Sequence, residues 1–112
     1  MELFHGKLHI HIIEARNLPV ISRIKKDDVP DPYVRGFFDN VKLFKTKFIV
    51  DNMNPIWDKH FDIPVKQEAH CLILEVLDKN KYHVDGTIGK LLIEAKELKS
   101  GVSKIAYTFI DT

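Results

Sequence analysis

Hydrophobic and polar residues alternate along seven segments of this chain, and the pattern predicts β-strands. In the first segment, Leu8, Ile10 and Ile12 alternate with polar residues. A period of two, with many β-branched and aromatic residues, favours strands over helices. The predicted strands span residues 7–16, 33–39, 41–50, 57–65, 71–78, 86–93 and 103–110, and residues 94–99 are expected to form a short helical turn. Short strands at fairly regular spacing predict an all-β fold, an antiparallel sandwich or barrel.

Two of these segments show the alternation of side chains clearly. In residues 41–50, one side is expected to carry Phe44, Thr46, Phe48 and Val50. In residues 57–65, Trp57, Phe61, Ile63 and Val65 are in phase, and they predict a second apolar strip.

Length and composition narrow the class of protein. The 112 residues fit one domain, spanning 1–112. A net charge of +1 gives no overall attraction for nucleic acid, so no nucleic-acid partner is expected. The one cysteine, Cys71, excludes a disulfide within the chain. No apolar stretch approaches the ~20 residues of a membrane span, and no signal peptide is evident, so any contact with a bilayer is expected to be peripheral.

Acidic residues stand at the edges of predicted strands in two distant parts of the chain. Asp31 begins Asp31-Pro32-Tyr33-Val34, and Asp78 begins Asp78-Lys79-Asn80, with Asp85 following shortly afterwards. Such carboxylates converge if their loops lie at one end of a sandwich, and hard oxygen ligands suit Ca²⁺. This favours a binding module over an enzyme. The alternative is that Asp31 and Asp78 are turn residues that accept backbone amides.

An ordered set of motifs resembles a C2 domain. The set is Gly6-Lys7-Leu8, Glu14-Ala15-Arg16-Asn17-Leu18-Pro19, Asp31-Pro32-Tyr33-Val34, Lys45-Thr46-Lys47, Asn54-Pro55-Ile56-Trp57 and Ile88-Gly89. The start of the chain and the residues after Trp57 are most similar to the C2 domain of eukaryotic phospholipase D. The resemblance implies an eight-stranded antiparallel Greek-key β-sandwich whose loops bind Ca²⁺ and anionic phospholipid. Only seven strands are visible, so the eighth is either missing or supplied by a partner, and an open sheet edge would favour a homodimer.

The resemblance also implies a set of Ca²⁺ ligands, which is eroded here. Asp31 and Asp78 match two aspartates of the family, Asn80 replaces a third, and Asp85 is displaced by one residue. The three loops of the resemblance span residues 20–30, 51–55 and 78–87, and Asp27 and Asp28 are expected to help if the first loop folds inward. Fewer carboxylates predict weaker binding and fewer ions.

Apolar and basic residues in the same loops predict contact with lipid. Those of the first loop are Ile21, Arg23, Ile24, Lys25 and Lys26, and those of the third are Tyr82 and Val84. A second basic patch matches positions that bind phosphoinositide headgroups in some C2 domains, and it consists of Tyr33, Arg35, Lys45 and Lys47. The alternatives are an ordinary solvated loop for the first set and solvation of an exposed strand for the second.

Other candidate chemistry is weaker. His9 and His11 share a strand face and could bind a transition metal, but no third ligand is evident, so outward polar alternation is favoured. His5-Gly6-Lys7 begins the His-x-Lys string of phospholipase D active sites, but Ile12 occupies the position of the required acid. No enzyme activity is expected, although the chain could regulate a lipid-modifying enzyme whose catalytic part lies elsewhere.

These observations predict a cytoplasmic, peripheral membrane-targeting domain. Its expected function is Ca²⁺-dependent binding of anionic phospholipid, either phosphatidylserine or a phosphoinositide. The alternative is a Ca²⁺-independent module for protein–protein interaction.

Overall fold

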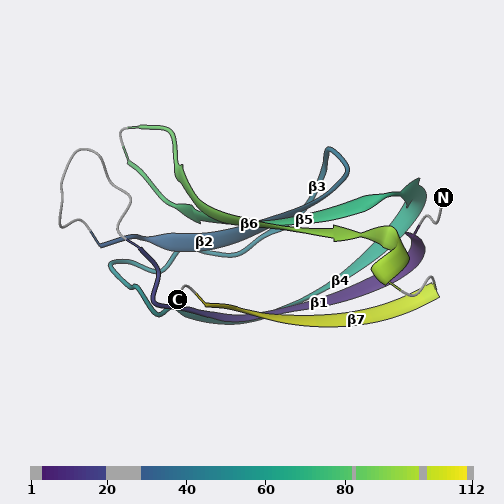
Figure 1. Cartoon of the computed structure of the whole chain (residues 1–112), viewed down its shortest axis with the longest axis horizontal. Helices are drawn as coiled ribbons and strands as arrows, with labels where there is room; N and C mark the ends of the chain where they lie inside the picture. Colours follow the sequence, from purple (N-terminus) through teal and green to yellow (C-terminus); the bar gives the residue numbers. More distant parts are fainter. Residues whose placement is uncertain (1–3, 20–28, 82, 99–100, 111–112) are drawn as a thin grey trace.

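Two β-sheets face each other in a sandwich (Figure 1). The computed structural model describes residues 4–19, 29–81, 83–98 and 101–110. One sheet contains β1 (Phe4–Arg16), β4 (Ile56–Ala69) and β7 (Gly101–Ile110), and the other contains β2 (Pro32–Phe38), β3 (Val41–Lys45), β5 (Cys71–Asp78) and β6 (Gly86–Glu94). A single turn of 3₁₀-helix, η1 (Ala95–Glu97), follows β6. The predicted all-β sandwich is confirmed.

The chain passes repeatedly between the two layers. The strand orders are β4-β1-β7 and β3-β2-β5-β6. All pairings are antiparallel except that of β1 with β7, which is parallel, with Ile10 opposite Ile105. The described residues contain seven strands, and the expected eighth is not among them. Completion of the sheet by a partner, and homodimerisation, stay predictions.

The core lies between the sheets. Leu8, Ile10 and Ile12 of β1 are fully buried and pack in one cluster with residues of the second sheet such as Val34 and Leu74. Full burial of each such side chain contributes about 1.5–3 kcal/mol. The Trp57 indole is also buried and donates a hydrogen bond of 3.3 Å to the carbonyl oxygen of Pro32. This contact ties the start of β4 to the start of β2.

The third predicted strand is shorter than expected, because β3 ends at Lys45. The Thr46 hydroxyl accepts the amide of Val34 at 2.9 Å, so a side chain occupies the donor that a continuing strand would use. Phe48 and Val50, which were expected inside this strand, lie beyond its end and are 47% and 63% exposed. Phe44 and Thr46, by contrast, are buried.

No helix in the described part of the chain is long and apolar enough to cross a bilayer.

Candidate functional site

Asp31 and Asp78 meet at one end of the sandwich. Asp78 ends β5 and lies opposite Pro32, the first residue of β2, so the strand register brings the two aspartates together. The amide of Asp31 donates to Asp78 Oδ1 at 2.8 Å, and the amide of Lys79 donates to the Asp31 carbonyl oxygen at 3.0 Å. Two loops that are far apart in sequence are therefore joined by direct hydrogen bonds.

The segment between β3 and β4 joins the same end. The amide of Asp51 donates to Asp31 Oδ1 at 2.7 Å, and the amide of Asn52 donates to the Pro30 carbonyl oxygen at 2.9 Å. Asp31 thus contacts both the end of β5 and the β3–β4 segment. Its carboxylate accepts a backbone amide, as expected for a turn residue, which was the alternative interpretation.

Asp85 is held by three groups. Its Oδ1 accepts the amide of Asn80 at 2.8 Å, and its Oδ2 accepts the hydroxyl of Tyr33 and lies 3.8 Å from Lys79 Nζ. Burial opposes ionisation of Asp85, but the hydrogen bonds from Tyr33 and Asn80 and the nearby charge of Lys79 outweigh it, so the pKa of Asp85 lies below its usual range. Burial, followed by the bond to Asp85, raises the pKa of Tyr33 to about 12.

The described residues offer Ca²⁺ a partial set of oxygen ligands. Asp31 and Asp78 have the right chemistry and are joined through the Asp31 amide, and one carboxylate oxygen of each accepts a backbone amide. Both oxygens of Asp85 have partners within the protein. The Asn80 amide oxygen accepts the backbone amide of His83 at 3.2 Å. In the part of the chain that the structure describes, Asp31, Asp78 and Asp85 do not each bring an oxygen within 4.8 Å of both others. Asp27 and Asp28 lie outside the described residues.

A basic pocket lies beside these loops. We call it the lysine pocket. Its volume is about 600 Å³, and it is lined by Tyr33, Lys45, Thr46, Lys47, Phe48 and Lys79. The Lys45 ammonium group lies 5.9 Å from the centroid of the Tyr33 ring. The lysines therefore converge on a concavity that has both an aromatic and an apolar wall, which suits an anionic headgroup.

The pocket includes three of the four residues predicted for the basic patch and adds three others, Thr46, Phe48 and Lys79. Arg35 is engaged elsewhere, because its Nε donates to Glu75 Oε1 at 2.7 Å. Phe48 was expected inside the strand of residues 41–50, but β3 ends at Lys45. Lys79 carried a weak signal, since it directly follows Asp78, but only the fold makes it line the same pocket as Lys45 and Lys47.

The predicted apolar contacts with lipid are described at one position. Val84 is 93% exposed, which is high for a valine. Ile21, Arg23, Ile24, Lys25, Lys26 and Tyr82 lie outside the described residues.

Fold and site together define an all-β sandwich with acidic loops and a lysine-lined pocket at one end. The family model for the C2 domain matches residues 6–107, and this chain belongs to the C2 domain family. The resemblance inferred from the motifs is confirmed.

Relatives of this chain include lipid-binding proteins and lipases. It is 34% identical over 100 residues to the calcium-dependent lipid-binding protein of Arabidopsis thaliana, covering 88% of this chain and 19% of that protein. It is 30% identical to phospholipase D gamma 2 of the same plant, covering 90% of this chain and 14% of that protein. Among solved structures, the human GIVD cytosolic phospholipase A2 superposes with a TM-score of 0.72 and 26% identity, over 88% of this chain and 14% of that one. The chain thus spans less than a fifth of the length of each of these relatives.

Proposed function

We propose that this C2 domain binds anionic phospholipid at the cytoplasmic surface of a membrane, as a peripheral protein, and that Ca²⁺ promotes this binding. The observation that carries the proposal is the contact between Asp31 and Asp78 next to the lysine pocket. Oxygen ligands for a hard cation and ammonium groups for a phosphate lie at the same end of the fold. The relatives named as lipid-binding or lipid-hydrolysing proteins support the same class of ligand.

The lysine pocket supplies the electrostatic part of this function. Lys45, Lys47 and Lys79 line one concavity, with the Lys79 ammonium group also 3.8 Å from Asp85 Oδ2, and each basic residue near an anionic membrane contributes about 1 kcal/mol. The headgroup is a phosphatidylserine or a phosphoinositide. Phe48 on the rim and Val84 in the β5–β6 loop provide exposed apolar surface for the lipid interface.

Asp31 and Asp78 would hold the Ca²⁺ ion, with Asn80, Asp27 and Asp28 as further ligands. When bound, the ion supplies positive charge that offsets repulsion between these carboxylates and a lipid phosphate. Asp85 acts as a positioning residue, because its contacts with Tyr33 and Asn80 hold the β5–β6 loop against β2.

Vesicle cosedimentation tests the proposal. Binding to vesicles that contain phosphatidylserine should rise with Ca²⁺ and fall with chelator, and neutral phosphatidylcholine vesicles should bind little in either case. The double variant D31N/D78N should lose the Ca²⁺ response, and K45Q/K47Q should bind less in both conditions. The matched control is K7Q/K59Q, since these exposed lysines lie on the other sheet. A Ca²⁺ response that survives in D31N/D78N would contradict the assignment of the ion to these loops.

A Ca²⁺-independent protein-interaction module is the second candidate. The occupied oxygens of Asp85 favour it, because they reduce the charge available to a cation. Calorimetry with millimolar Ca²⁺ separates the two candidates. Binding of Ca²⁺ to the native state must raise the melting temperature by mass action, so the absence of both heat and a shift in Tm would support the second candidate.

A further inference from the structure

Histidines and aspartates gather on the outer face of the three-stranded sheet, away from the lysine pocket. Leu8, Ile10 and Ile12 point into the core, so His9 and His11 point outward from β1. In the antiparallel register with β4, His9 lies opposite Asp62 and His11 lies opposite His60. Because paired residues share a face, the register places their side chains next to one another.

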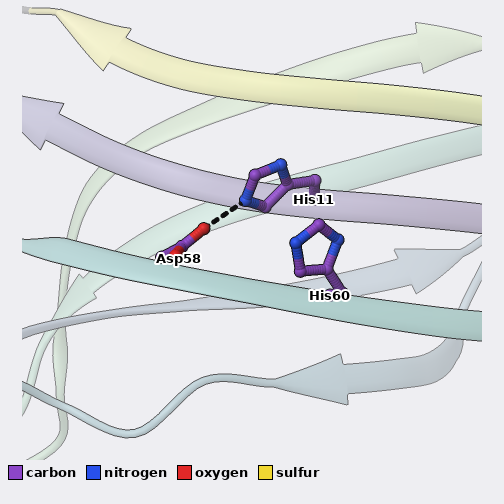
Figure 2. Close-up of side chains that lie close together, drawn as sticks. All are labelled: His11, Asp58 and His60. Atoms are coloured by element: carbon purple, nitrogen blue, oxygen red, sulfur yellow. Dashed lines mark hydrogen bonds and ion pairs between the residues drawn. The ribbon is translucent and has the colours of Figure 1, made fainter.

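Three of these side chains converge closely enough to share an ion (Figure 2). Nε2 of His11 lies 2.6 Å from Asp58 Oδ1, and the His11 and His60 rings are stacked with centroids 3.8 Å apart. His11, Asp58 and His60 each offer one ligand atom, and all three atoms lie within 4.8 Å of one another. His9 extends the cluster, since its Nε2 lies 3.3 Å from Nδ1 of His60 and its Nδ1 contacts Asp62.

A backbone irregularity brings Asp58 into this cluster. The β1–β4 register passes from Ile12 opposite Lys59 to Glu14 opposite Ile56, so two residues of β4 face one residue of β1. This is a β-bulge, a feature that re-aims a side chain. Asp58 has a positive φ of 47°, a conformation that aspartate and asparagine tolerate better than most residues. The bulge explains why strand alternation alone does not reveal the third ligand.

We propose that His11, Asp58 and His60 form a transition-metal site that prefers Zn²⁺ to Ca²⁺. Imidazole nitrogens suit Zn²⁺, Cu²⁺ and Ni²⁺, whereas Ca²⁺ takes oxygen ligands. Ligands of tetrahedral Zn²⁺ at about 2.0–2.2 Å from the metal lie roughly 3.4 Å apart, so small rotations of these side chains are enough. Asp58 and His60 are exposed and His11 is half-buried, so an ion reaches the site directly from solvent. His9 or a water completes the coordination.

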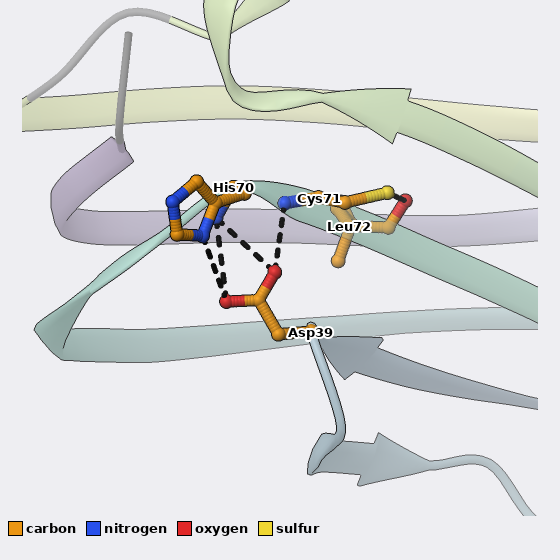
Figure 3. Close-up of polar contacts among 4 residues, drawn as sticks. All are labelled: Asp39, His70, Cys71 and Leu72. Carbon is orange, nitrogen blue, oxygen red and sulfur yellow. Dashed lines mark hydrogen bonds and ion pairs between the residues drawn. The ribbon is translucent and has the colours of Figure 1, made fainter. Parts of the chain in front are cut away.

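A shared ion would add to the contact between the His11 and His60 rings. A single exposed ion pair, such as the one between His11 and Asp58, adds little stability. A bound cation instead lets both rings donate a lone pair to one centre. A second histidine–aspartate pair, His70 and Asp39, differs from this cluster because it has only two members (Figure 3). Nδ1 of His70 lies 3.4 Å from Oδ2 of Asp39. Among the described residues, His70 belongs to no group of three side chains whose ligand atoms lie close enough to share a metal ion.

Titration of the purified chain with Zn²⁺ against a chromophoric chelator tests the proposal. One Zn²⁺ per chain should bind, and D58N and H60Q should each weaken binding by about tenfold or more. Asparagine is chosen at position 58 because it keeps the tolerance for positive φ. H70Q is the matched control and should bind Zn²⁺ as the unaltered chain does. Substitution of Co²⁺ gives an independent readout, with visible absorption typical of a tetrahedral site that disappears in H60Q.

Two results would overturn the site. One is failure of the unaltered chain to bind Zn²⁺ at concentrations up to about 100 μM, which is weak for a site with three protein ligands. The other is equal affinity in the unaltered chain, D58N and H60Q, each shown to be folded by circular dichroism. A result in which H70Q alone loses binding would also reject it. None of these outcomes depends on vesicle binding, so this proposal stands or falls separately from the proposed lipid function.

Discussion

The Tyr33 hydroxyl donates a hydrogen bond of 2.5 Å to Asp85 Oδ2. Tyr33 is buried in β2, and Asp85 lies just before β6, so the bond fixes the β5–β6 loop to β2, an inner strand of the same sheet. Tyr33 also lines the lysine pocket. One side chain therefore sets both the position of an acidic loop and one wall of the basic pocket.

Replacement of Tyr33 by phenylalanine should lower the free energy of unfolding by about 1–2 kcal/mol at neutral pH, because a partly buried carboxylate loses a donor. The pKa of Asp85 is lowered in the folded state, so this stability is present above the unfolded value of about 4 and is lost as pH falls through the folded pKa. The difference between Y33F and the unaltered chain should therefore shrink in acid. Urea unfolding at several pH values measures it.

A double-mutant cycle with D85N isolates this bond. The change Y33F should cost much less in the D85N background than in the unaltered chain, with a coupling of about 1 kcal/mol. Additive effects of the two changes would mean that the hydrogen bond contributes nothing, despite its geometry.

Alkaline titration tests the same contact from the tyrosine side. The folded pKa of Tyr33 is about 12, above the unfolded value of about 10, so its contribution to stability is complete below pH 10 and is lost as pH rises through 12. Ultraviolet absorbance of phenolate should show one tyrosine ionising late, and Y33F should lack that step. A late step retained in Y33F would assign it to Tyr82 or Tyr107 instead.

Local pattern was enough to predict most of the fold, because burial of one strand face leaves a period of two in the sequence. β5 runs from Cys71 to Asp78 as predicted, and β1 contains the predicted alternation of Leu8, Ile10 and Ile12. Prediction from the pattern fails where a side chain or a bulge interrupts the regular backbone hydrogen bonds between strands. Thr46 takes the Val34 amide and ends β3, which exposes Phe48. Asp58 occupies a bulge, which no alternation can indicate.

In the candidate site, too, some residues were predictable from the sequence and others depend on the three-dimensional fold. Asp31 and Asp78 were identifiable because carboxylates at strand ends are conspicuous, and the register brings them into contact. The engagement of Asp85 by Tyr33 could not be anticipated, because it depends on how the β5–β6 loop folds back. The metal-sized cluster on the other sheet depends equally on pairing between β1 and β4, which are more than forty residues apart.

Gly36 is expected to be intolerant of alanine. A Cβ atom there would lie 2.2 Å from Cε1 of Phe44, the residue opposite in β3. The Phe44 ring is buried and stacked on Phe61, with centroids 4.5 Å apart, so it has little room to move. Overpacking of this kind should destabilise G36A by about 1–3 kcal/mol in urea or thermal unfolding.

Gly89 supplies the matched control for that change. A Cβ atom at Gly89 meets nothing within 4 Å, and so G89A should be neutral or stabilising by up to about 1 kcal/mol through a less flexible unfolded chain. Equal losses in both variants would indicate a general intolerance of alanine in these strands rather than the specific contact with Phe44.

Arg35 and the pocket lysines should separate stability from lipid binding. Glu75 is buried and accepts Arg35 Nε at 2.7 Å and the Thr87 hydroxyl at 2.9 Å, with Lys90 Nζ 3.8 Å away. Replacement R35M leaves this carboxylate with fewer partners. Because Arg35 is partly exposed and two partners of Glu75 remain, the free energy of unfolding should fall by about 1–2 kcal/mol rather than by the larger cost of breaking a fully buried pair.

The variant K45Q/K47Q should instead change the free energy of unfolding by less than about 0.5 kcal/mol, since both lysines are exposed. In vesicle cosedimentation we expect the opposite ranking: R35M, the less stable variant, should keep lipid binding, and K45Q/K47Q should lose it. Loss of binding in R35M at a temperature where it remains folded would mean that the guanidinium contacts lipid as well as Glu75, and the basic surface would then extend beyond the lysine pocket.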